Sequence, residues 1–164
     1  MKKLLFILFL SIFIVTGCGN EKEISKNKDD VNHTFITVHS NEEGKIVIAT
    51  KDITTEATFV NYVVDDVTIQ FIVVRGTDGK VRIAFNTCQS CNPSPNAYFK
   101  QVGEYLQCQN CGNKFHIDEI GEEQGGCNPA PVEEKEETDD QIVIDKDYVD
   151  TYKAKFEKWS GPTK

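Results

Sequence analysis

Two Cys-x-x-Cys pairs constrain this chain more than any other feature of its sequence. Cys88 and Cys91 form the first pair, and Cys108 and Cys111 form the second after sixteen intervening residues. Two residues between cysteines is the spacing at which both sulfurs of a tight turn can face one metal ion. Two such turns supply four thiolates, so the sequence predicts a four-cysteine metal site.

Two further side chains are candidates for the same site. Cys127 begins a Cys-Asn-Pro-x-Pro motif that repeats the motif beginning at Cys91. We interpret the two motifs as similar loops that present Cys91 and Cys127 from opposite sides of one site; the alternative is that both motifs are only loop punctuation. Cys127 is then a fifth ligand in an exchange, a capping thiol or a structural neighbour. His116 offers a three-cysteine, one-histidine alternative, but a surface or strand histidine also explains it.

The N-terminus has the pattern of a bacterial lipoprotein signal peptide. Lys2 and Lys3 precede an apolar run of about a dozen residues, which is too short to span a bilayer as a helix. The run ends in Val15-Thr16-Gly17-Cys18, which resembles the lipobox in which the cysteine is lipidated. We therefore expect a signal peptide at 1–17, a lipid anchor on Cys18, and a location on the extracytoplasmic face of the bacterial cell membrane.

Cysteine count and net charge narrow the function further. Setting Cys18 aside leaves five of the six cysteines, an odd number that disulfides cannot pair completely. The formal net charge of −8 becomes −10 once the two signal-peptide lysines are removed. This acidity argues against nucleic acid as a partner and against electrostatic attraction to anionic lipid.

Composition divides the mature chain into a tether and one domain. Residues 18–34 are mostly polar and charged, which predicts a flexible tether. Residues 35–164 are enough for a single metal-binding domain with its own core. An acidic run predicts a solvated loop at about 132–141.

The domain has a mainly β pattern. Runs rich in β-branched and aromatic residues at 57–64 and 67–74 flank Asp65-Asp66, which predicts a β-hairpin. A further run at 81–85 leads to the first cysteine pair, and a short strand at 105–107 leads to the second. Both pairs are therefore expected on loops at strand ends, which is a suitable support for a rigid site.

The C-terminal segment predicts a helix over 147–159. Its aromatic residues recur on one helical face, so we expect them to pack against the sheet. We predict a mainly β (α+β) fold, namely a small antiparallel sheet domain with a metal site on two strand-end Cys-x-x-Cys loops and a C-terminal helix.

Several motifs are shared with a known family. They are segment 70–85, both Cys-x-x-Cys pairs, Tyr98, Gly112, Phe115, Ile120-Gly121, the Gly-Gly-Cys-Asn-Pro-x-Pro element at 125–131, and Ile142-Val143-Ile144. Together they resemble the FtrD-like, membrane iron–sulfur-containing protein domain over about residues 45–160. The Gly-Gly-Cys-Asn-Pro-x-Pro element is the specific part, since paired Cys-x-x-Cys motifs occur in many metal sites.

This resemblance implies a role in bacterial high-affinity iron uptake, beside an iron permease and periplasmic or surface redox partners. Family members are associated with passing electrons or handling iron. Many carry several transmembrane helices before the domain, whereas here only a lipid anchor is expected. A membrane-embedded electron path is then not supplied by this chain itself.

The metal remains open between an iron–sulfur cluster, a single iron and zinc. Four cysteines suit all three. The signal peptide has no twin arginine, which favours export in an unfolded state and therefore a mononuclear metal acquired afterwards. The resemblance favours iron–sulfur.

Three candidate functions are compatible with the cysteine motifs. The first is a redox or iron-handling lipoprotein, the second a structural zinc module that binds a protein partner, and the third a thiol–disulfide protein. The third needs its Cys-x-x-Cys at a helix N-terminus, which the prolines after Cys91 disfavour. The sequence has no convincing hydrolase or phosphate-binding motif, so an accessory protein is predicted rather than a catalyst.

Overall fold

The computed structural model describes residues 33–164. The predicted signal peptide, the Cys18 anchor and nearly all of the predicted tether lie outside these residues. The elements are β1 (Thr34–Val38), β2 (Lys45–Ala49), β3 (Thr58–Val64), β4 (Val67–Arg75), β5 (Val81–Cys88), β6 (Phe99–Val102), β7 (Tyr105–Cys108), β8 (Lys114–His116), a short 3₁₀ turn (Ile117–Glu119), β9 (Pro129–Pro131), β10 (Glu136–Glu137), β11 (Gln141–Asp145), α1 (Lys146–Asp150) and α2 (Lys153–Phe156). No helix within the described range is long and apolar enough to cross a membrane.

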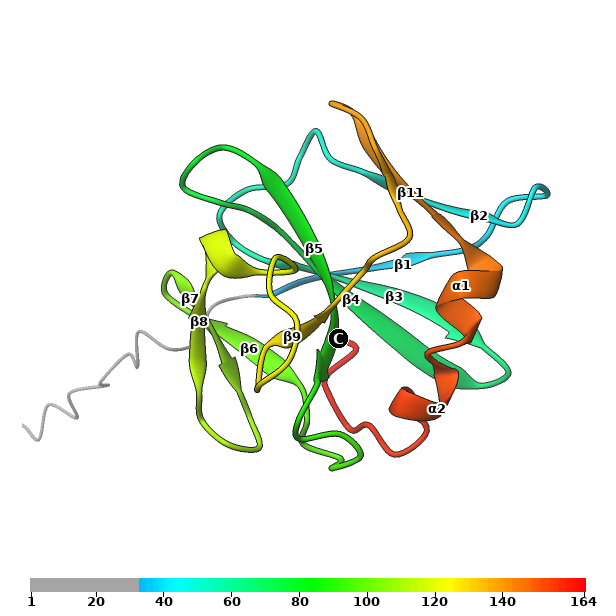
Figure 1. Cartoon of the computed structure of the whole chain (residues 1–164). Coiled ribbons are helices and arrows are strands. Elements are labelled where there is room, and N and C mark those ends of the chain that lie inside the picture. The colour runs from blue at the N-terminus through cyan, green and yellow to red at the C-terminus, as the bar shows by residue number, and fades with distance from the viewer. Residues whose placement is uncertain (1–32) are drawn as a thin grey trace, which may run out of the picture.

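The strands form three small sheets. The central sheet has the order β1-β3-β4-β5-β9, and two three-stranded sheets have the orders β10-β11-β2 and β6-β7-β8. All pairings are antiparallel except that of β1 with β3. In Figure 1 the β6-β7-β8 sheet lies on the opposite side of the molecule from α1 and α2. The predicted mainly β fold with antiparallel sheets is confirmed.

The hairpin expected around Asp65-Asp66 is present. Strands β3 and β4 pair from Thr58 with Val73 to Val64 with Val67, which leaves the two aspartates as the turn. Both have positive φ, 45° and 64°. This is the turn that matches the natural twist of a hairpin, and aspartate tolerates the left-handed region better than most residues.

The central sheet is buried on both faces. Alternate residues of β3, β4 and β5 point to opposite sides, so one face carries Tyr62, Phe71 and Phe85 and the other carries Phe59 and Ile72. The first face packs against β2, β11 and the helices, and the second packs against β6-β7-β8. Burial on both sides explains why β4 appears in the sequence as a nearly continuous apolar run.

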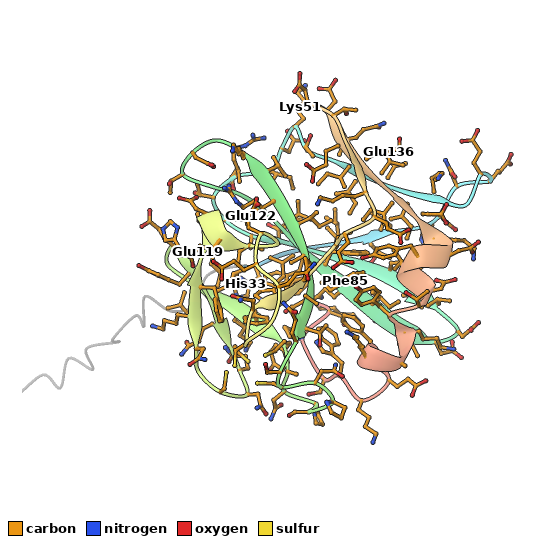
Figure 2. All side chains as sticks on the ribbon, in the orientation of Figure 1. His33, Lys51, Phe85, Glu119, Glu122 and Glu136 are labelled. Atoms are coloured by element: carbon orange, nitrogen blue, oxygen red, sulfur yellow. The ribbon has the colours of Figure 1, made fainter. Side chains whose placement is uncertain are left out.

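The C-terminal helix is shorter and more broken than the sequence predicts. Instead of one helix over 147–159, α1 and α2 are separated at Thr151 and Tyr152, whose N–H groups donate to carbonyls only three residues back. The Thr151 hydroxyl also donates to the Tyr148 carbonyl at 2.6 Å. The ring of Tyr152 stacks on Phe85, near the centre of Figure 2, at 3.9 Å between centroids. The aromatic face thus packs as predicted.

A chain of buried amides crosses the central sheet. The Gln70 side chain donates to Asn61 Oδ1 and accepts from Asn86 Nδ2, both at 2.7 Å. Asn86 Oδ1 in turn accepts the backbone N–H of Phe99, at the start of β6. Gln70 also donates to the carbonyl of Pro162 in the C-terminal tail. One polar network therefore ties together three central strands, the β6-β7-β8 sheet and the tail.

Replacing Gln70 tests this network. Gln70→Leu removes the buried partner of Asn61 Oδ1 and leaves Asn86 Nδ2 with only a long contact of 3.4 Å to the Phe99 carbonyl. We expect the free energy of unfolding to fall by about 2–4 kcal/mol, since each unsatisfied buried polar group costs about 1–3 kcal/mol. Chemical denaturation of the reduced, metal-free chain measures the loss. Gln141→Leu, at an exposed position of β11, is the matched control and should change stability by less than about 0.5 kcal/mol. Equal losses for the two variants would contradict the role of the network.

Candidate metal centre

Each cysteine pair begins at the end of a strand, as the sequence predicts. Cys88 is the last residue of β5, and Cys108 is the last residue of β7. Both are almost fully buried in the core between the central sheet and β6-β7-β8. The first sulfur of each pair is therefore fixed by sheet hydrogen bonds and by packing.

The two pairs fold into the same kind of turn. The N–H of Asn92 donates to the carbonyl of Cys88 at 3.1 Å, and the N–H of Gly112 donates to the carbonyl of Cys108 at 2.9 Å. Gly112 has a φ of 80°, as expected for a glycine that closes such a turn. Each turn directs its second cysteine back toward the first, so both pairs face a common centre.

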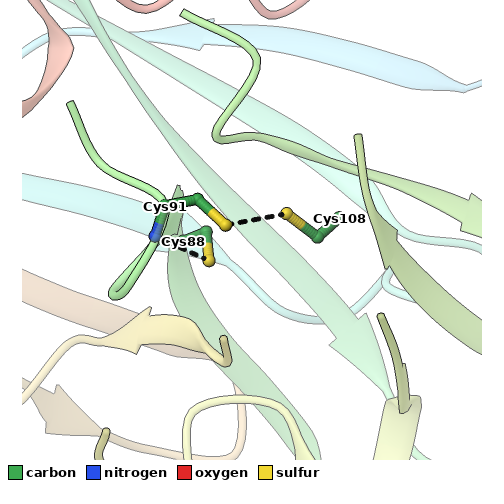
Figure 3. A group of neighbouring side chains, drawn as sticks. All are labelled: Cys88, Cys91 and Cys108. Carbon is green, nitrogen blue, oxygen red and sulfur yellow. Dashed lines mark hydrogen bonds between the residues drawn. The ribbon is translucent and has the colours of Figure 1, made fainter. Parts of the chain in front are cut away.

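All five cysteines of the domain meet in one cluster. The Sγ atoms form two overlapping groups whose members lie within 4.8 Å of one another: Cys88, Cys91 and Cys108, and then Cys91, Cys111 and Cys127. Figure 3 shows the first group, in which the Sγ atoms of Cys91 and Cys108 are 3.9 Å apart. Two thiolates on one tetrahedral ion with metal–sulfur bonds of ~2.3 Å would be ~3.8 Å apart. The spacing of this pair therefore fits a shared metal ion.

The buried thiols are protonated in the metal-free protein. Burial raises the pKa of Cys88 far above its usual range, and burial raises that of Cys108 to about 11. Cys88 Sγ accepts the N–H of Cys91 and lies 3.3 Å from the carbonyl oxygen of Cys127, to which its thiol donates. Because a bound cation stabilises thiolates, metal binding would release these protons.

Cys111 is the exposed member of the cluster. Partial desolvation opposes ionisation there, but the N–H of Asn113 and the neighbouring thiols outweigh it and lower the pKa of Cys111. Cys127 is half-buried, and the adjacent Cys111 raises its pKa. The cluster thus has a buried side, formed by Cys88 and Cys108, and an outer side where Cys111 is exposed and Cys127, like Cys91, is half-buried.

The two Cys-Asn-Pro-x-Pro motifs differ in conformation although their cysteines converge. The first follows Cys91 as a turn with a cis Asn92–Pro93 peptide, whereas Pro129–Pro131 of the second is strand β9, paired with β5. The sulfurs of Cys91 and Cys127 nevertheless lie in one group, so the two motifs bring their cysteines to one centre without being similar loops.

His116 has other contacts. It ends β8, where its Nδ1 accepts the N–H of Asp118 at 3.3 Å. Its ring packs edge-on against Tyr105, and its Nε2 lies 3.9 Å from a carboxylate oxygen of Glu104. Neither of the two sulfur groups includes this histidine.

Sequence reasoning missed the C-terminal segment that supports the first cysteine turn. Asn92 Nδ2 donates to the Lys155 carbonyl at 2.7 Å, and Ser160 donates its N–H to the Pro95 carbonyl at 2.9 Å. The Trp159 indole donates to the carbonyl of Asn86 on β5. These contacts join residues far apart in the chain, so no local pattern predicts them. The sequence shows only that these positions carry side chains that can form hydrogen bonds.

The donor set suits a thiophilic metal. All five cysteines in the described part of the chain are free thiols, and soft thiolates select iron–sulfur centres, zinc or copper over calcium and magnesium. The residues after Cys88 form turns rather than a helix, so the first pair does not lie at a helix N-terminus. The arrangement can hold a metal and keep water from its buried side.

Comparison with known proteins identifies one family. A family model described as membrane iron–sulfur containing protein FtrD-like matches residues 53–156, which include all five clustered cysteines. No curated protein and no solved structure matches the chain.

Thiol reactivity tests this geometry in the metal-free chain. Iodoacetamide at neutral pH should modify Cys111 first, because Cys111 is exposed and its lowered pKa gives it a larger thiolate fraction at this pH than an ordinary cysteine has. Cys88 and Cys108 should react last, and their reaction should require high pH or unfolding. Mass spectrometry of peptides over time gives the order. Faster modification of Cys88 than of Cys111 would contradict the structure.

Proposed function

The chain belongs to the FtrD-like family of membrane iron–sulfur containing proteins, and from this premise we propose that it is a lipid-anchored redox component of iron uptake. Its centre would be an iron–sulfur cluster or a single iron. The protein would pass electrons or handle iron at the extracytoplasmic face of the membrane. It would act as an accessory of an iron permease or of a periplasmic or surface redox partner rather than as a catalyst.

The observation that carries this proposal is the convergence of five free thiols on one centre. Cys88, Cys91, Cys108 and Cys111 are the proposed ligands. Bound iron would supply a one-electron couple, whose potential depends on ligand type, burial and hydrogen bonds to sulfur. Here the ligands are thiolates, and the Cys91 N–H already points at Cys88 Sγ.

The two sides of the cluster suit electron transfer. Burial of Cys88 and Cys108 keeps water away from one side, which holds the surroundings of the centre constant during a redox cycle. Exposure of Cys111 on the other side gives a partner a short approach to a ligand sulfur. A centre buried on all sides would lack such an approach.

A structural zinc module is the second candidate. Cys₄ sites with both pairs on turns commonly hold zinc and contribute folding energy outright. The family description favours iron over this alternative. A thiol–disulfide function ranks last, because neither described helix begins at a cysteine.

Absorption spectroscopy and metal analysis separate the first two candidates. The full chain isolated from its own cell envelope should contain iron and show visible sulfur-to-iron absorption that is bleached by reduction and restored by oxidation. Cys88→Ser and Cys108→Ser should each abolish that absorption, because each removes a buried ligand. A colourless protein with stoichiometric zinc would rule out electron transfer.

Substitution at Cys18 tests the location. Cys18→Ala should move the protein from the membrane fraction to the soluble or secreted fraction, because it removes the acceptor of the lipid anchor. Its iron content per chain should not change, since Cys18 is outside the domain. Membrane association that survives this change would contradict the proposed anchor.

A further inference from the structure

The cluster offers more thiols than a tetrahedral ion can bind. Five Sγ atoms converge on Cys91, whereas one tetrahedral ion takes four ligands. Any mononuclear site here must leave one cysteine out. The question is which sulfur that is, and whether the choice is fixed.

The supports of the five cysteines differ. Cys88 and Cys108 are the last residues of paired strands and are fully buried. Cys111 and Cys127 lie on turns and are less buried than Cys88 and Cys108, with Cys111 exposed and Cys127 half-buried. Gly125 and Gly126, directly before Cys127, have φ values of 88° and 62°. Glycine adopts this backbone at little cost, so the Cys127 turn can shift more easily than a strand.

The Cys127 turn is nevertheless held toward the first cysteine pair by side chains. Gln89 Oε1 accepts the N–H of Gly125 at 2.8 Å, and Gln89 Nε2 lies 3.3 Å from the carbonyl of Pro129. The Ser90 hydroxyl donates to the carbonyl of Gly126. Gln89 and Ser90 are the two residues between Cys88 and Cys91, so the first pair itself positions the fifth cysteine.

The residues inside the second cysteine pair do not position the Cys127 turn. Gln109 occupies the same place in its pair as Gln89, but its Nε2 donates to the carbonyl of Gln107, two residues back on β7. Asn110, the counterpart of Ser90, contacts the Ser94 hydroxyl. Neither residue contacts the Cys127 turn through a hydrogen bond within residues 33–164. The contacts of Gln89 and Ser90 are therefore not a general property of such turns.

We propose that Cys111 and Cys127 are alternative fourth ligands of one metal ion whose other three ligands are Cys88, Cys91 and Cys108. Gln89 and Ser90 are positioning residues that keep Cys127 within reach. This inference rests on the proposed function only in taking the cysteines as metal ligands. It adds a solvent-facing ligand exchange, by which the metal can be accepted or released without losing its three inner thiolates.

The exchange conserves charge and ligand number. Cys127 Sγ forms a bond to the metal as Cys111 Sγ gives one up. Cys127 loses its thiol proton to water, and Cys111 takes up a proton when it leaves. The metal keeps its oxidation state, so no oxidant or reductant is needed.

Cobalt(II) titration of the reduced, metal-free full chain tests the inference, with a competing chelator to set the affinity scale. Cys111→Ser and Cys127→Ser should each still bind one equivalent with thiolate absorption, and with affinity within about tenfold of the unaltered chain. The double variant should bind at least about a hundredfold more weakly. The single variants also show that each serine is tolerated by the fold. If either single variant is as weak as the double variant, its cysteine is the sole fourth ligand and the proposal is wrong.

The positioning role is tested in the Cys111→Ser background, where only Cys127 remains as the outer ligand. Adding Gln89→Ala should weaken Cobalt(II) binding about tenfold, whereas adding Gln109→Ala should not. The same Gln89→Ala change in the Cys127→Ser background should also have no effect on affinity. An equal loss in both backgrounds would mean that Gln89 acts on the first turn as a whole, and would overturn its role in positioning Cys127.

These outcomes are independent of the native metal. Cobalt binding in the expected pattern by a chain that carries zinc in its own envelope would contradict the proposed redox function and leave the exchange standing. If the protein is redox-active with iron but Cys127→Ser does not change cobalt(II) affinity, either in the unaltered chain or in the Cys111→Ser chain, the proposed redox function stands and the ligand exchange is wrong.

Discussion

The buried side chain of Asn86 joins two sheets of this molecule, since its Nδ2 donates to Gln70 Oε1 within the central sheet while its Oδ1 bonds to the β6-β7-β8 sheet. Asn86 lies two residues before Cys88 on β5, and its other amide atom accepts the N–H of Phe99 at the start of β6. The sheet that carries the second cysteine pair is thereby registered against the strand that carries the first. Because the amides are buried, the network tolerates little displacement.

This registration gives the cysteine cluster two unequal sides. The strand ends fix Cys88 and Cys108 in a dry environment, where thiols stay protonated until a cation replaces the protons. The turns place Cys111 and Cys127 on the outer side of the cluster, on backbone that contains glycine. A rigid inner half sets the properties of a bound metal, while the outer half gives access. This combination suits both of the proposed roles, metal handling and electron transfer.

Local sequence signals were enough for much of the fold and of the candidate site. The Asp65-Asp66 hairpin, the strand ends at both cysteine pairs and the positive φ of Gly112 follow from short-range rules. Strand β9 was not predicted, since two prolines in three residues argue against a strand. It is tolerated because β9 is the edge strand of the central sheet.

What the sequence could not supply depends on contacts between distant residues. The proposed role of Gln89 could not be predicted without knowing that the loop around Gly125 contacts the first cysteine turn. The break between α1 and α2 falls at Tyr152, whose ring stacks on Phe85 of the distant strand β5. X-ray absorption at the iron edge of protein from its native envelope identifies the atoms bound to the metal. We expect iron with sulfur neighbours, and we expect this signal to be lost in Cys88→Ser. Iron bound only by oxygen or nitrogen, or zinc in its place, would contradict it.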